Sequence, residues 1–195
     1  MDKAKNMTEP TANVNGSRLD GASFETVGKR AVATESDSVT PEQMITVREV
    51  PCDDEGLLAL IAKLDHYLSS LYPADEIFGV DLSAPATREM VFAVAFLGNR
   101  PVGCGGIRGL DDGTAELKRF YVEPDVRRAG IAGKVYGYLE HRAAEMGHTI
   151  LRLETGEPQY ESIGFYRKQG FYEIERFGEY VDCDSSYCME KRISR

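Results

Sequence analysis

The sequence predicts an α+β protein in which a mixed, mostly antiparallel sheet of six to seven strands is flanked by helices. Three observations favour this class. Strand-like segments outnumber segments with helical spacing. Three strand-like segments follow one another with only short turns between them, as in an antiparallel meander. One helical segment, residues 130–146, lies between two strand-like segments and adds a parallel crossover.

Composition restricts the class of protein further. The chain has 195 residues, 42% hydrophobic and 28% charged, which suits one soluble domain. The apolar run at Met90–Gly98 is too short to cross a bilayer, and the first ten residues lack the apolar core of a secretory signal. We therefore expect a cytoplasmic protein with no membrane partner. The net charge of −9 argues against a nucleic-acid partner, and the cysteines and histidines have no metal-ligand spacing.

The chain divides into two parts. Residues 1–43 are polar and without periodicity, so they are predicted to form a disordered tail. The domain is predicted to cover residues 44–195. It opens with an alternating strand at 44–50 and an amphipathic helix at 53–73, whose first turn carries the acidic residues that a helix N-terminus favours.

The predicted meander forms the centre of the domain, with Gly98 and Gly113 at its turns. Its strands are expected at residues 89–98, 101–110 and 114–122. In the third strand, side-chain alternation predicts that one face is shared by Glu116, Lys118, Phe120 and Val122. The segments that follow are expected to be a helix at 130–146, a strand at 149–155, a helix at 161–170, and final strands at 171–177 and 185–193.

The segment Arg127–Lys134 immediately precedes and opens the predicted long helix. Its small residues leave backbone N–H groups accessible, and a helix N-terminus carries partial positive charge, so an anion is expected there. A nucleotide-triphosphate loop would need glycine where Arg128 stands and Ser or Thr where Val135 stands. The dinucleotide-binding pattern GxGxxG is also missing from this segment.

A third alternative rests on a family resemblance. Arg127-x-x-Gly130-x-Ala132 resembles the Arg/Gln-x-x-Gly-x-Gly/Ala motif of the GNAT superfamily of N-acetyltransferases. The segment "SIGFYRKQGF", Ser162–Phe171, is similar to that family's closing Tyr-x-x-x-Gly-Phe motif. The stretches "LDHYLSSLYP", "LDDGTAELKR" and "LRLETG" resemble an uncharacterised branch labelled YsnE-like. The resemblance covers about residues 44–193 and implies the GNAT fold, with acetyl-coenzyme A (acetyl-CoA) as co-substrate.

The resemblance also implies where acetyl-CoA binds. In the family, the diphosphate lies on the backbone amides of the loop, and the pantetheine arm pairs with the strand before it. Gln159 stands where family members often have an Asn that holds this arm. The implied cofactor-binding residues are Phe120, Tyr121, Val122, Arg127, Arg128, Ala129, Gly130, Ile131, Ala132, Gly133, Lys134, Gln159 and Tyr166.

Two residues are candidates for the chemistry. Glu116 resembles the catalytic glutamate of the histone-acetyltransferase branch and would act as general base through a water; alternatively, it is a strand residue paired with Lys118. Tyr166 falls where the family places a hydroxyl near the coenzyme sulfur, and a tyrosine is protonated at neutral pH. It would act as general acid; alternatively, it is a packed core residue. Direct transfer is expected, without an acyl-cysteine step.

The acceptor is expected to be a primary amine of a small molecule. Residues 45–82 contain eight acidic and two basic residues, a balance that would attract a cation, although a solvated helix face explains it equally well. The rival functions are a protein lysine or N-terminal acetyltransferase and a non-catalytic acyl-CoA sensor. The sequence is compatible with a homodimer as well as a monomer. The candidate substrate-binding residues are Tyr72, Phe78, Asp81 and Tyr180.

Overall fold

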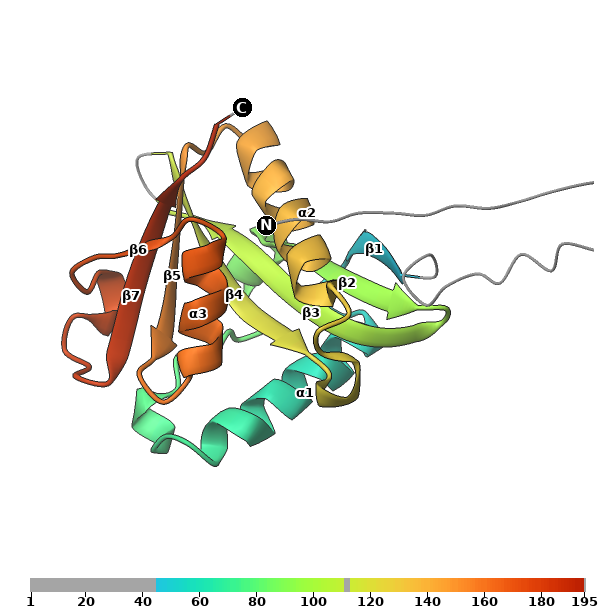
Figure 1. The fold of residues 1–195 in the computed structure, drawn as a ribbon, viewed down its shortest axis with the longest axis horizontal. Helices are drawn as coiled ribbons and strands as arrows, with labels where there is room; N and C mark the ends of the chain where they lie inside the picture. The colour runs from blue at the N-terminus through green and yellow to red at the C-terminus, as the bar shows by residue number, and fades with distance from the viewer. Residues whose placement is uncertain (1–44, 111–112, 195) are drawn as a thin grey trace, which may run out of the picture. The chain divides into compact units, whose positions relative to one another are not determined.

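A computed structural model describes residues 45–110 and 113–194 and confirms the α+β class (Figure 1). Seven strands form one sheet in the order β1-β2-β3-β4-β5-β7-β6. Neighbouring strands are antiparallel except β4 and β5, which are parallel. The predicted tail at 1–43 lies outside the described residues. The strands are β1 (Ile45–Val50), β2 (Val91–Leu97), β3 (Arg100–Gly109), β4 (Thr114–Val122), β5 (Ile150–Gly156), β6 (Tyr172–Glu173) and β7 (Ser186–Arg192); the helices are α1 (Glu55–Ser69), α2 (Ile131–Glu145) and α3 (Tyr160–Lys168).

Two hydrophobic clusters lie on opposite faces of the sheet. Successive side chains of a strand point to opposite faces, and in β2 they divide between the clusters. Val91, Ala93 and Ala95 pack with the α2 and α3 side chains. Phe92 and Val94 pack with α1. The continuous apolar sequence of β2 is therefore explained by burial on both faces.

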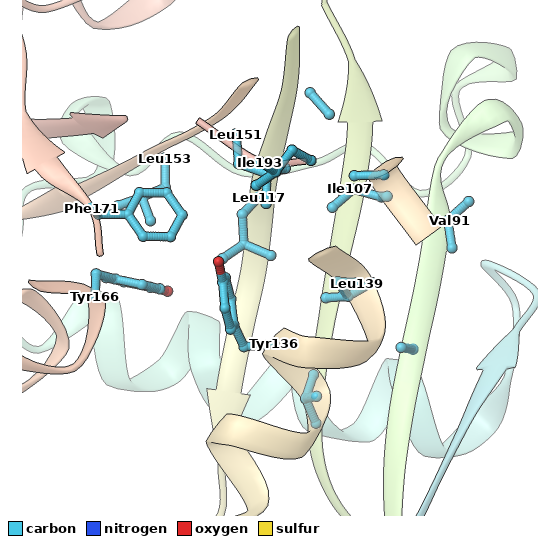
Figure 2. Close-up of a cluster of buried hydrophobic side chains, with 14 of the residues drawn as sticks. Val91, Ile107, Leu117, Tyr136, Leu139, Leu151, Leu153, Tyr166, Phe171 and Ile193 are labelled. Atoms are coloured by element: carbon cyan, nitrogen blue, oxygen red, sulfur yellow. The ribbon is translucent and has the colours of Figure 1, made fainter. Parts of the chain in front are cut away.

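Helix α2 packs on the sheet through an apolar stripe, whereas Met146, which fits the same spacing, is exposed at the C-cap. Val135, Leu139 and Ala143 are all fully buried. Figure 2 shows Leu139 near Ile107 on β3, and Tyr136 beside Leu117 on β4; the helix also packs on β2. This contact fixes the N-terminal end of α2 close to the end of β4.

Helix α1 is shorter than the predicted 53–73 at both ends: it stops at Ser69, and a cap defines its start. The Asp54 side chain accepts a hydrogen bond from the backbone N–H of Leu57 at 2.9 Å, so the helix begins at Glu55. The last predicted strand before β7 is shorter as well. Of residues 171–177, only β6 pairs with β7, because the chain then leaves the sheet edge and buries Tyr180, which is 1% exposed.

A bulge in β4 corrects the predicted arrangement of its side chains. Cys104 pairs with Tyr121 and Gly106 with Lys118, so β4 has one extra residue here, and Arg119 adopts a left-handed φ of 55°. Beyond the bulge the alternation is reversed. Phe120 and Val122 pack with the α2-side cluster, on the opposite face from Glu116 and Lys118. The prediction that all four share one face is wrong.

Leu139 provides a test of the α2 packing. We expect Leu139→Ala to lower the free energy of unfolding by about 2–5 kcal/mol, because its buried side chain would leave a cavity against the sheet. Urea denaturation followed by circular dichroism measures the change. Met146→Ala at the exposed end of the helix is the control and should stay within about 0.5 kcal/mol of the parent. Equal losses in the two variants would contradict this packing.

Candidate acetyl-transfer site

The sheet opens where the parallel pair ends. Residues Thr114–Leu117 of β4 pair with Ile150–Leu153 of β5, and pairing stops there. Figure 1 shows the two strands separating toward their carboxyl ends. A pocket occupies the opening. Its walls include Lys118, Arg119 and Phe120 from β4 and Glu154, Thr155 and Gly156 from β5.

The loop before α2 presents unpaired backbone donors. Gly130 has a left-handed φ of 78° and forms the N-cap of α2. From Arg128 to Gly133, no backbone N–H donates to another backbone group among the described residues. A Cβ built at Gly130 or Gly133 would meet nothing within 4 Å, so a ligand can approach the backbone closely. These donors at a helix N-terminus fit a diphosphate group.

The other residues predicted to bind the cofactor belong to the loop itself, to the end of β4 and to the first turn of α2. Arg128, Ala129 and Lys134 are exposed, whereas the Ile131 side chain is buried under the helix. Arg127 Nε donates to the Val122 carbonyl at 3.2 Å and so ties the loop to the end of β4. Phe120 and Val122 lie on the α3 side of that strand, whereas the Tyr121 side chain belongs to the α1-side cluster. Ala132 is partly buried in the first turn of α2.

Gln159 lies at the start of α3 and lines the pocket. Its Oε1 accepts hydrogen bonds from Thr155 Oγ1 at 3.1 Å and from the Gly156 N–H at 3.3 Å. The Tyr72 hydroxyl donates to the same oxygen at 3.3 Å. The side-chain NH₂ of Gln159 has no protein acceptor among the described residues, so it can donate to a ligand.

Tyr166 lines the pocket from α3 and is 6% exposed. Its ring packs edge-on against Phe120, Phe165 and Phe171, with centroid separations of 6.0, 5.3 and 5.6 Å. Figure 2 shows it beside Phe171. Burial raises the pKa of the Tyr166 hydroxyl, which therefore stays protonated at neutral pH and can donate a proton or hydrogen bond.

Glu116 lies behind the pocket wall. It is 0% exposed, and its carboxylate accepts hydrogen bonds from Arg108 Nε at 2.6 Å and from the Tyr180 hydroxyl. Lys118 Nζ is 3.6 Å from the same carboxylate and donates to Tyr180 at 2.7 Å and to Glu179 at 2.9 Å. The general-base role of Glu116 stays a prediction. In this geometry Glu116 contacts the residues that form the wall, and the wall separates it from the pocket.

Three of the four predicted acceptor residues line the pocket. Phe78 and Tyr180 pack edge-on with ring centroids 4.9 Å apart. Tyr72 lies near β5, and burial raises the pKa of its hydroxyl to about 12, so it is a neutral donor. Asp81 is exposed and outside the pocket, and it accepts hydrogen bonds from the backbone N–H and the hydroxyl of Ser83. The structure thus brings Tyr72, Phe78 and Tyr180 together without Asp81.

Comparison with known proteins shows which family has this sequence and geometry. The model of the acetyltransferase (GNAT) family matches residues 60–171, more than half of the chain. The protein belongs to the GNAT family. An IAA acetyltransferase from Azospirillum brasilense is 39% identical to this GNAT enzyme over 147 residues, which cover 75% of this chain and 95% of the relative. The uncharacterised N-acetyltransferase YsnE from Bacillus subtilis is 27% identical over 142 residues, covering 70% of this chain and 92% of that protein.

Solved structures share the same fold. A Klebsiella pneumoniae protein named as an acyl-CoA N-acyltransferase has a TM-score of 0.68 and 30% identity, over 77% of this chain and 98% of that one. The PaiA N-acetyltransferase from Thermoplasma acidophilum, solved with coenzyme A, has a TM-score of 0.58 and 20% identity, over 76% and 98% of the two chains. Members of the GNAT family use acetyl-CoA, and the exposed loop amides of this member suit its diphosphate.

One pocket carboxyl in this GNAT enzyme was not predicted. Glu154 is the first β5 residue beyond the stretch that pairs with β4, and it is half-buried in the pocket wall. Burial raises its pKa. The sequence did contain a usable pattern, because Leu151 and Leu153 alternate with polar residues, which places Glu154 on the acceptor side at the carboxyl end of a parallel strand.

The two cysteines in the strands of this GNAT enzyme are inaccessible. Cys104 and Cys188 are buried in the sheet, at 0% and 2% exposure, and burial raises the pKa of the Cys104 thiol to about 12. Both are therefore poor nucleophiles.

Within residues 45–110 and 113–194, no group of three metal-ligating side chains occurs. No helix in these ranges is long and apolar enough to span a bilayer.

Proposed function

We propose that this GNAT enzyme transfers the acetyl group of acetyl-CoA directly to a primary amine of a small molecule. One observation carries the proposal. The opening between β4 and β5 connects Tyr166, on the α3 side, with a pocket that contains carboxylates on the α1 side. The thioester and the amine could therefore meet in this opening from opposite faces of the sheet.

The closure of the acceptor side supports a small molecule over a peptide. Ser185 Oγ donates to Glu76 Oε2 at 2.5 Å, which links the chain before β7 to the segment after α1. Phe78 and Tyr180 pack together in the same region. Because these two segments bridge the pocket, an extended peptide would have to break the bridge before it could bind.

The charges of the pocket favour an amine. Lys118 Nζ already donates to Tyr180 and Glu179. The guanidinium of Arg119 pairs with Asp65 and donates to the Phe78 carbonyl at 2.8 Å. The cations of the wall are thus largely neutralised, whereas the Glu154 carboxyl lines the pocket and, among the described residues, accepts a side-chain hydrogen bond only from Ser186. An ammonium group would complement this charge.

Each side of the opening has a distinct role in the proposal. When bound, acetyl-CoA would supply the thioester carbonyl that an amine attacks. The donors at Arg128–Gly133 would hold its diphosphate, and the Gln159 amide would orient the pantetheine arm. Tyr166 would give its proton to the departing sulfur. Glu116 would fix Lys118 and Tyr180 in the wall.

A coupled binding and turnover experiment tests the proposal. Calorimetry should detect coenzyme A binding. Release of its thiol should then be followed with acetyl-CoA and a panel of polyamines, amino acids, aromatic amines and a lysine peptide. IAA, the acceptor in the name of the Azospirillum relative, belongs in the same panel. We expect turnover of at least one small amine.

Each contrary outcome of that experiment identifies a different error. Turnover of the peptide alone would favour a protein acetyltransferase. Binding of coenzyme A without turnover of any acceptor would favour an acyl-CoA sensor. Turnover of IAA but of no amine would retain the acyltransferase and overturn the amine acceptor.

A further inference from the structure

We infer that Glu154 is the catalytic base that removes the proton from the acceptor amine. This inference rests on the proposed function, since it assigns a role in amine acetylation. It differs from the sequence-based assignment of Glu116, and it starts from the position of the two carboxyl groups relative to the pocket.

Glu154 is accessible from the pocket. It lines the pocket directly after Leu153, the last β5 residue that pairs with β4, where the sheet opens. Its Oε1 accepts a hydrogen bond from Ser186 Oγ at 2.8 Å. A carboxylate can accept several hydrogen bonds, so this contact orients the group and leaves acceptor capacity toward the pocket. Glu116, in contrast, has no exposed surface.

Glu154 lies on the acceptor side of the sheet, opposite Tyr166. Leu153 belongs to the α2-side cluster, so the next residue along the strand, Glu154, faces the α1 side, where Phe78 and Tyr180 form the acceptor wall. Tyr166 lies on the other side, from α3. A base on the acceptor side and an acid on the thioester side is the arrangement that acetyl transfer to an amine requires.

The electrostatic environment of Glu154 makes its carboxylate more basic. Burial raises its pKa, and the carboxylate of Glu116 acts in the same direction, whereas Ser186, Lys118 and Arg119 lower it. A pKa raised above the ordinary range of a glutamate makes the anion a stronger base near neutral pH. The titratable groups around the carboxyl are Glu116, Lys118 and Arg119 on β4, Cys188 on β7, and Tyr72, Glu76 and Tyr180 in the pocket wall.

The proposed proton transfers use only the two substrates, water and the side chains of Glu154 and Tyr166. Glu154 takes one proton from the ammonium, and the free nitrogen attacks the carbonyl carbon. As the C–N bond forms and the C–S bond breaks, Tyr166 gives its proton to sulfur. The nitrogen then loses its second proton, which restores the Tyr166 hydroxyl. Glu154 releases its proton to water, so the products are the amide, the thiol and one proton.

The kinetic test compares Glu154→Gln with the parent enzyme on an amine from the active panel. The variant should lower kcat by about 10²–10⁴-fold, because the amide cannot accept the proton. Its calorimetric affinity for coenzyme A should be unchanged, since no part of the loop before α2 is altered. Glu157→Gln is the matched control. Glu157 is exposed in the loop that follows β5, and its variant should retain parental kcat.

A second test measures proton binding without turnover. Carbon-13 NMR of carboxyl-labelled glutamate, assigned with Glu154→Gln, should show Glu154 titrating above the ordinary range. Ser186→Ala removes a hydrogen bond that stabilises the anion, so it should raise this pKa further. The acidic limb of the kcat/KM–pH profile, which reports the free enzyme, should move to higher pH by the same amount.

The outcomes separate this inference from the proposed function. A parent enzyme that turns over no amine overturns both. An active parent with an unaffected Glu154→Gln variant overturns the inference alone. It is equally overturned if the variant raises the KM of the amine and leaves kcat unchanged, since Glu154 would then only bind the ammonium. A kcat/KM profile that Ser186→Ala does not move, although the NMR titration shifts, also rejects the base role.

Discussion

Replacing Tyr166 with phenylalanine should lower kcat for acetyl transfer by about 10²-fold or more, because the variant has no proton to give to the departing sulfur. The affinity for coenzyme A should change by less than about threefold, since the ring and its aromatic contacts remain. Burial keeps the parent hydroxyl protonated at neutral pH, so the proton is available throughout the working range. Stopped-flow or steady-state thiol release measures the effect.

A second tyrosine on the same helix provides the control for Tyr166. Tyr160 is 75% exposed at the start of α3, and Tyr160→Phe should leave kcat at the parental value. Thermal unfolding should be similar in both variants, because no described side chain bonds to the Tyr166 hydroxyl. If Tyr166→Phe kept full kcat, the tyrosine would be a core residue only, and another proton donor would have to serve the sulfur.

The sequence predicted those parts of the fold that local patterns specify. Helix α2 has a regular apolar spacing, and the glycine that caps it, Gly130, has the left-handed φ that favours this residue. The meander was predictable because its strands are consecutive and Gly98 occupies a tight turn with a φ of 60°. In each case the information lies within a few neighbouring residues, so no knowledge of the tertiary structure was needed.

The missed features depend on contacts between distant segments. The β4 bulge is centred on Arg119, which has a left-handed φ although it is not a glycine, so the sequence does not mark the bulge. The Arg119 guanidinium pairs with Asp65 on α1, far away in the sequence. Glu116 is buried by contacts with Arg108 and Tyr180, which lie on β3 and on the segment before β7. Such burial cannot be recognised from the alternation of one strand.

The loop before α2 gives the second large effect. Gly133→Glu should weaken coenzyme A binding by about 10²-fold, because the new carboxylate would repel the diphosphate, and two unit negative charges about 5 Å apart cost roughly 2–3 kcal/mol at an effective dielectric constant of about 20–40. The same substitution should raise the free energy of unfolding by about 0.5–1 kcal/mol, since glutamate is a better helix former than glycine and favours a first turn. A Cβ at this position meets nothing within 4 Å, so no clash opposes this gain.

Opposite signs of the two effects make the prediction specific. A variant that merely unfolds would lose binding and stability together, whereas a repelled diphosphate leaves the protein intact. Gly137→Glu adds the same charge one turn further along α2, again in open space, and should weaken binding far less. Calorimetry at rising salt concentration completes the test, because repulsion between exposed charges is screened. If Gly133→Glu bound coenzyme A as tightly as the parent, the diphosphate would have to lie elsewhere than on the amides from Arg128 to Gly133.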